Sequence, residues 1–131
     1  PVAEAKGLAS NQTGQVAGVE DIVTGTYKLA SGVHGMGTWC FSAYGREDRN
    51  EIIGSKGKLV FSTFGHEPII LEAAEGTTRF PFESPEHIQQ PLIQTIVNDL
   101  LGIGKCASTG ESAARTSRVM DALIKGWQDL Q

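Results

Sequence analysis

Residues 50–61 read Asn-Glu-Ile-Ile-Gly-Ser-Lys-Gly-Lys-Leu-Val-Phe, and this stretch decides the fold. Two segments of strand length, 51–54 and 58–61, flank a connection of only a few residues. This pattern is typical of a β-hairpin with a tight turn. We expect Gly54 and Gly57 to supply the positive φ angles that such a turn requires.

Further strand-like segments lie on both sides of this hairpin. Residues 2–10 are weakly apolar, residues 21–29 are rich in β-branched and aromatic residues, and residues 33–43 alternate glycine with Met36 and Thr38. Gly-rich turns separate them at a spacing of about ten residues, which indicates an antiparallel sheet. These segments are residues 2–10, 21–29, 33–43, 68–73 and 77–82.

The hydrophobic period changes after the last of these segments. Apolar residues recur at helical spacing over residues 88–101 and stop at Gly102, which predicts a helix. Pro91 either opens the regular part of this helix or marks a distorted first turn. A second helix is predicted to begin at Ser108, because Ser108 and Glu111 have the spacing of a capping box.

The order of elements, with strands first and helices last, predicts an α+β fold. We expect residues 1–131 to form one domain, an open and mainly antiparallel β-sheet with both C-terminal helices packed on one face. Two helices cannot cover both faces of a wide sheet. Some large side chains should therefore lie on the other face, which we predict to be an oligomer interface. The side chains that do not all fit under the helices are Val23, Tyr27, Trp39, Phe41, Phe61 and Phe64.

Composition excludes several classes of protein. The net charge of -4 argues against nucleic-acid binding. The basic residues near the hairpin alternate with acidic ones such as Glu47 and Asp48, which favours a solvated hairpin end over a phosphate site. No apolar run approaches the roughly 18 residues of a membrane span. Cys40 and Cys106 are too few for a disulfide framework, so we expect free thiols and a cytoplasmic location.

A search for catalytic motifs gives only weak candidates. Residues 102–107 fit the letters of the dinucleotide fingerprint G-x-G-x-x-A, but the required strand-turn-helix context is missing, so a helix end and loop is the better interpretation. No spacing of His, Cys or carboxylate residues suggests a metal site. Five polar residues at element ends remain as candidates for a substrate cleft, although a solvated turn or local hydrogen bond explains each more simply. They are Tyr44, Arg46, His66, Arg79 and His87.

Three motifs, in their order and spacing, carry a resemblance to a known family. They are Gly35-Met36-Gly37-Thr38-Trp39, residues 51–59 of the hairpin, and Ser108 to Ala113 followed by Val119-Met120-Asp121. With these motifs the chain resembles the C-terminal sheet domain of the glucose–fructose oxidoreductase / inositol dehydrogenase (Gfo/Idh/MocA) family of NAD(P)-dependent oxidoreductases. The resemblance extends from about Val2 to Trp127.

This resemblance implies that a substantial part of the enzyme lies outside the chain. Family members bind NAD or NADP in an N-terminal Rossmann domain, which also carries the catalytic lysine of a Glu-Lys-Pro motif. The present sequence contains no such tripeptide. We therefore expect no catalytic, cofactor or metal residue here, and an isolated chain without activity. The resemblance further implies a sugar, polyol or related substrate, and a homo-oligomer, dimer or tetramer, formed through the open sheet face.

Two other interpretations stay open from the residues alone. The chain could be a stand-alone, non-catalytic binding or dimerisation module of the same fold, because fold does not fix function. It could also be a small hydrolase or isomerase that uses His66 or His87. A native reading frame that begins near Pro1 would favour the first, and activity lost on His→Ala substitution would favour the second.

Overall fold

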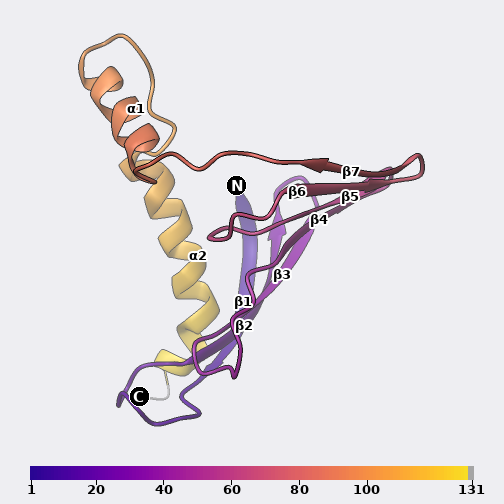
Figure 1. Cartoon of the computed structure of the whole chain (residues 1–131). Coiled ribbons are helices and arrows are strands. Elements are labelled where there is room, and N and C mark those ends of the chain that lie inside the picture. Colours follow the sequence, from indigo (N-terminus) through magenta and orange to yellow (C-terminus); the bar gives the residue numbers. More distant parts are fainter. Residues whose placement is uncertain (130–131) are drawn as a thin grey trace. The chain divides into compact units, whose positions relative to one another are not determined.

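The computed structural model describes residues 1–129 and divides the chain into two compact units (Figure 1). The first unit combines Pro1–Tyr44 with the chain from Cys106 onward, and the second unit is Gly45–Lys105. Each unit contains one antiparallel sheet and one helix. The α+β class with open antiparallel sheets and two C-terminal helices is thereby confirmed, although the strands form two sheets rather than one.

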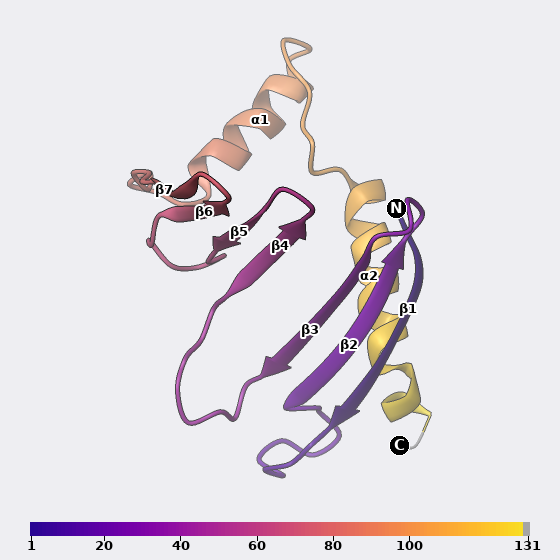
Figure 2. The ribbon, with the colours of Figure 1, turned by 90° about the vertical axis from the view of Figure 1, so that its right-hand side faces the viewer.

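The sheet of the first unit has three strands in the order β1-β2-β3. They are β1 (Val2–Ser10), β2 (Ile22–Leu29) and β3 (His34–Cys40), close to the three segments that the sequence predicts. Gly32, with a φ of 90°, closes the turn between β2 and β3. Figure 2 shows the three strands side by side, with α2 (Gly110–Gln128) running along them.

A row of glycines lets α2 approach this sheet closely. Gly7, Gly25 and Gly37 are cross-strand partners on neighbouring strands. A Cβ on Gly7 would overlap the backbone carbonyl of Leu123 in α2, and a Cβ on Gly25 would lie 2.5 Å from the Leu123 side chain. Only glycine leaves room for a backbone at this distance. Helix α2 therefore packs on the Gly7 and Gly25 part of this row.

Two aromatic rings of the same sheet cover glycines, one of them within this row. The ring of Tyr27 lies over its cross-strand partner Gly35, where a Cβ would collide with it. Trp39 covers Gly37 in the same way, with its ring 2.7 Å from the place of a Cβ. Rings over glycines replace the side-chain contacts that glycine lacks within a sheet.

The start of α2 differs from the prediction by one residue. The N-cap is Thr109, whose hydroxyl accepts a hydrogen bond from the Ser112 backbone amide at 3.2 Å. The Ser112 hydroxyl accepts one from the Thr109 amide at 2.9 Å. The expected Ser108–Glu111 pair was therefore wrong, because Thr109 and Ser112 have the same spacing and satisfy the same amides. Glu111 lies instead in the first turn, where a carboxylate favours the helix dipole.

The second unit contains a four-stranded meander in the order β4-β5-β6-β7. Its strands are β4 (Asn50–Gly54), β5 (Gly57–Phe61), β6 (Ile69–Ala73) and β7 (Gly76–Phe80). The predicted hairpin is confirmed, with Gly54 paired to Gly57. The expected positive φ angles were wrong, because neither residue adopts one. Gly57 is needed for another reason, since a Cβ there would lie 2.6 Å from the Glu72 carbonyl of β6.

The helix of the second unit is α1 (Gln90–Leu100). Pro91 lies in its first turn, one residue after the helix begins, and Gly102 follows its end with a φ of 72°. No residue of α1 is buried. Within the described residues 45–105, α1 packs on none of the four strands. The expected packing of helices on one sheet face therefore holds for α2 on β1 and β2, and not for α1 within its own unit.

The large apolar side chains singled out from the sequence differ in how deeply they are buried. Among the residues that the structure describes, three apolar side chains are buried, namely Val23, Val60 and Leu123. Of the large side chains expected to exceed the space under the helices, Phe41 and Phe64 are strongly exposed. The chain therefore carries more apolar surface than its own two units cover.

Candidate functional site

The five candidate cleft residues lie on separate segments. Tyr44 is the last residue of the segment Pro1–Tyr44 in the first unit, and it is fully exposed. In the second unit, Arg46 precedes β4, His66 lies between β5 and β6, Arg79 is on β7 and His87 precedes α1, all of them exposed. Across the described part of that unit, no hydrogen bond or ion pair links any two of these four side chains. The four candidates of the second unit are therefore separate polar residues rather than one hydrogen-bonded group.

His66 is the candidate with a nucleophile beside it. Its Nδ1 lies 2.9 Å from the Ser84 hydroxyl, so the two side chains share a hydrogen bond. Nucleophilic catalysis needs a base that a third group orients, and a site sheltered from water. Both His66 and Ser84 are exposed. The geometry therefore fits a surface hydrogen bond that ties two loops together.

Asp48 is a polar centre that the sequence did not reveal. Its carboxylate accepts hydrogen bonds from the Phe64 amide at 2.5 Å and from the Ser62 hydroxyl at 3.0 Å. The Phe64 amide is the main cause that holds the pKa of Asp48 below its ordinary value, and the Thr63 amide and the Ser62 hydroxyl also lower it. The charge of Arg46 acts in the same direction. Asp48 therefore anchors the loop that carries His66.

Asp21 plays a comparable part in the first unit. It accepts hydrogen bonds from the backbone amides of Gln12 and Thr13, both at 2.8 Å, and from the Thr13 hydroxyl at 2.7 Å. The Gln12 amide is the largest of the causes that lower the pKa of Asp21. An aspartate directly before a strand and a Thr-Gly pair in the preceding loop were the available sequence signals. Each unit thus contains a carboxylate that anchors a long loop.

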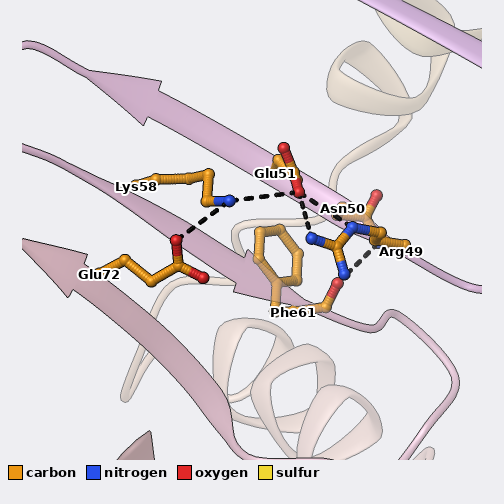
Figure 3. Close-up of polar contacts among 6 residues, drawn as sticks. All are labelled: Arg49, Asn50, Glu51, Lys58, Phe61 and Glu72. Atoms are coloured by element: carbon orange, nitrogen blue, oxygen red, sulfur yellow. Dashed lines mark hydrogen bonds and ion pairs between the residues drawn. The ribbon is translucent and has the colours of Figure 1, made fainter. Parts of the chain in front are cut away.

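The charged residues around the hairpin pair with one another (Figure 3). Glu51 forms ion pairs with Arg49 at 2.5 Å and with Lys58 at 3.7 Å, and Lys58 also reaches Glu72 at 3.1 Å. The hydrogen bond from Arg49 is the main cause that lowers the pKa of Glu51. Asn50, also drawn in Figure 3, lies 3.5 Å from the Phe61 carbonyl across the hairpin. The ion pairs therefore connect β4, β5 and β6. Both Arg49 and Lys58 are paired with carboxylates.

The face of the first sheet that lies away from α2 combines apolar and hydroxyl side chains. Leu8 and Met36 are each 81% exposed there by strand alternation. Leu8 pairs across the strands with Thr24, whose hydroxyl lies 3.4 Å from that of Thr38 on β3. We call this surface the open face of the first sheet.

One end of this open face is charged. Glu4 and Lys6 form an ion pair at 3.1 Å. The hydrogen bond from Lys6 is the main cause that lowers the pKa of Glu4, and the charges of Lys28 and His34 add to it. The open face thus carries charged residues at the Glu4 end, with Lys6 and Met36 in one cross-strand row, and Leu8 with two threonines in the next.

Neither a metal-binding cluster nor a membrane-spanning helix is present among residues 1–129. No group of three or more His, Cys, Asp or Glu side chains within residues 1–129 is arranged to hold a metal ion. None of the helices described is both long and apolar enough to span a membrane.

Comparison with known proteins supplies what the side chains alone do not. Residues 1–60 match the model of the GFO/IDH/MocA C-terminal domain. The resemblance to this oxidoreductase family is confirmed. The matched segment covers the whole sheet of the first unit and the β4–β5 hairpin up to Val60.

Solved structures share the fold at low sequence identity. An aldose-aldose oxidoreductase from Caulobacter crescentus, determined with glycerol, gives a TM-score of 0.78 at 14% identity over 97% of this chain and 39% of its own. An oxidoreductase domain protein from Kribbella flavida gives 0.76 at 18% identity, over 99% of this chain and 45% of its own. A putative oxidoreductase from Thermotoga maritima gives 0.74 at 16% identity, over 96% and 39%.

A curated relative is closer in sequence. Oxidoreductase P35 from Formosa agariphila is 32% identical over 99 residues, which are 76% of this chain and 30% of that relative. The chain therefore spans less than half the length of each of these proteins.

Proposed function

We propose that this chain is the C-terminal sheet domain of an NAD(P)-dependent oxidoreductase that acts on a sugar, polyol or related hydroxy or carbonyl compound. The intact cytoplasmic enzyme would pass a hydride between the nicotinamide and a substrate carbon, with a base or acid handling the hydroxyl proton. The cofactor and the catalytic lysine would belong to an N-terminal Rossmann domain. The present domain would contribute one wall of the substrate cleft.

The family match over residues 1–60 carries this proposal. The relative that is 32% identical is named an oxidoreductase, which supports the general activity. The substrate class comes from the family resemblance, and the name of the Caulobacter crescentus fold neighbour is in keeping with it. In this account, Tyr44, Arg46, His66, Arg79 and His87 remain the candidates for substrate contact.

We further propose that the open face of the first sheet forms a homo-oligomer contact. Leu8 and Met36 are among the most exposed apolar side chains of the chain, and α2 occupies the opposite face of the same sheet. Met36→Asp would place a charge in this contact and should lower the mass measured by light scattering to that of a monomer. Ser117→Asp on the exposed side of α2 is the matched control and should leave the mass unchanged. A monomer before any substitution would contradict the proposed contact.

An activity assay tests the proposed reaction. The native protein that contains this chain is purified and incubated with NADH or NADPH and a panel of aldoses, ketoses and oxidised polyols. We expect oxidation of the reduced cofactor by the native protein and none by residues 1–131 alone. Turnover by residues 1–131 would contradict the assignment of the cofactor site to an absent domain. Silence of a native protein that binds neither cofactor would contradict the oxidoreductase proposal and favour the binding module.

A further inference from the structure

Helix α1 presents an apolar stripe that the second unit leaves uncovered. The stripe lies on one side of the helix, because its residues are spaced one, three or four positions apart along the sequence. Their exposures range from 40% for Ile96 and Val97 to 83% for Leu100. The α1 stripe consists of Leu92, Ile93, Ile96, Val97 and Leu100.

One physical argument indicates that another surface covers the α1 stripe. An isolated helix of 11 residues is marginal in water, and most helical stability in proteins comes from packing of the apolar side. The partner surface should itself be apolar. The charged residue of α1 is Asp99, and its carboxylate already lies 3.5 Å from the Lys105 amine.

We propose that the α1 stripe is the docking surface for the part of the longer oxidoreductase that residues 1–131 lack, namely its cofactor-binding portion. This inference rests on the proposed function. The 99 matched residues are 30% of Oxidoreductase P35, which makes that relative about 330 residues long. Roughly 200 residues of a protein of that size would then lie outside this chain, enough for a complete second domain.

The size of the stripe favours an intramolecular partner over a second copy of this chain. A helix of 11 residues is about 16 Å long and 10 Å wide, so one side covers on the order of 200 Å². A stable interface between separate proteins needs about 800 Å² on each partner. A small apolar contact suffices when the partner is covalently linked, because the effective concentration is then in the millimolar range.

Hydrogen exchange tests this docking directly. Peptides that cover residues 90–101 are followed by mass spectrometry in the native protein and in residues 1–131. We expect exchange in the native protein to be at least about tenfold slower than in residues 1–131. Equal exchange in the two samples would overturn the inference while leaving the proposed function intact. Slow exchange of these peptides in residues 1–131 would also overturn the inference. If that exchange rate depends on protein concentration, a second copy of the chain covers the stripe. If it does not, the first unit covers it.

A pair of substitutions gives an independent readout. Leu100→Gln removes a side chain that is 83% exposed in this chain, so it should leave the Tm of residues 1–131 unchanged. In the native protein it should lower the Tm by about 2 °C or more, because it disrupts a buried contact. Gln94→Ala on the polar side of α1 is the control and should change neither Tm by a comparable amount. Equal effects of Leu100→Gln in both proteins would contradict the docking. A native frame that encodes only residues 1–131 would overturn the docking and the proposed function together.

Discussion

The two units of this chain contain similar elements but complete their cores differently. In the first unit, α2 lies on a glycine row and buries Leu123 against β1 and β2. In the second unit, Val60 is buried within the sheet while α1 has no buried residue. This difference shows that the apolar stripe of a helix does not by itself reveal which surface the helix packs against. A helix packs closely only where the facing sheet is shaped to receive it.

The largest expected loss of stability follows from a substitution in α2, at the residue that this helix buries against the first sheet. Leu123 is 7% exposed, so Leu123→Ala should lower the free energy of unfolding by about 2–5 kcal/mol. Val60→Ala in the second unit removes two buried methyl groups and should cost about 1–2 kcal/mol. Urea unfolding of the two variants measures both. A smaller loss at Leu123 than at Val60 would reverse the comparison of the two cores.

The glycine row is the next place to break the first unit. Gly7→Ala places a methyl group against the backbone of Leu123, which cannot yield as a flexible side chain would. Such overpacking should cost about 1–3 kcal/mol. Gly45→Ala is the matched control, because no atom lies within 4 Å of its Cβ position. If the two alanines have the same effect in urea unfolding, α2 does not sit on this row.

The cap of α2 should have a smaller effect. Thr109→Ala removes the hydroxyl that accepts a hydrogen bond from the Ser112 amide. This change should lower the free energy of unfolding by about 1 kcal/mol. Ser108→Ala tests the neighbouring residue that the sequence pattern favours and should be nearly neutral. Thermal unfolding of both variants separates the two assignments. A larger loss at Ser108 would place the helix start one residue earlier than the structure does.

The smallest expected effect concerns Asp48 in the second unit. Its pKa lies below the ordinary value of 3.8, mainly because the Phe64 amide donates to the carboxylate. Asp48 therefore stabilises the loop fully above the unfolded pKa, and this contribution is lost as the pH falls through the folded pKa. The amide proton shift of Phe64, followed by NMR, should titrate with a midpoint below 3.8 and lose this step in Asp48→Asn. A midpoint at or above 3.8 would contradict the anchoring role.

Local patterns predicted the strands and helices well. The weakly apolar run at residues 2–10 coincides with β1, and the hairpin around Gly54 and Gly57 has the expected partners. The helical period and Gly102 likewise mark the end of α1. These features depend on residues close together in the chain, which is why a single sequence contains them.

Features that depend on distant residues could not be predicted. The glycine row becomes visible only when the register places Gly7, Gly25 and Gly37 beside one another. Asp48 and Phe64 are 16 residues apart, and their hydrogen bond leaves no periodic signal. The division into two sheets depends on which strands pair, and strand composition does not determine this.

The candidate site was the least predictable part. Polar residues at element ends were chosen by type, and the structure places them on separate segments such as β7 and the loop of His66. Cleft residues are defined by the surfaces on both sides of a cleft. In the proposed enzyme, one of those surfaces belongs to residues outside this chain.

The native reading frame upstream of Pro1 tests the central claim most directly. The account predicts a frame of roughly 200 further codons that opens with a strand, a glycine-rich turn and a helix, and later encodes Glu-Lys-Pro. A start codon close to Pro1 would contradict it and would make this chain a domain that functions alone.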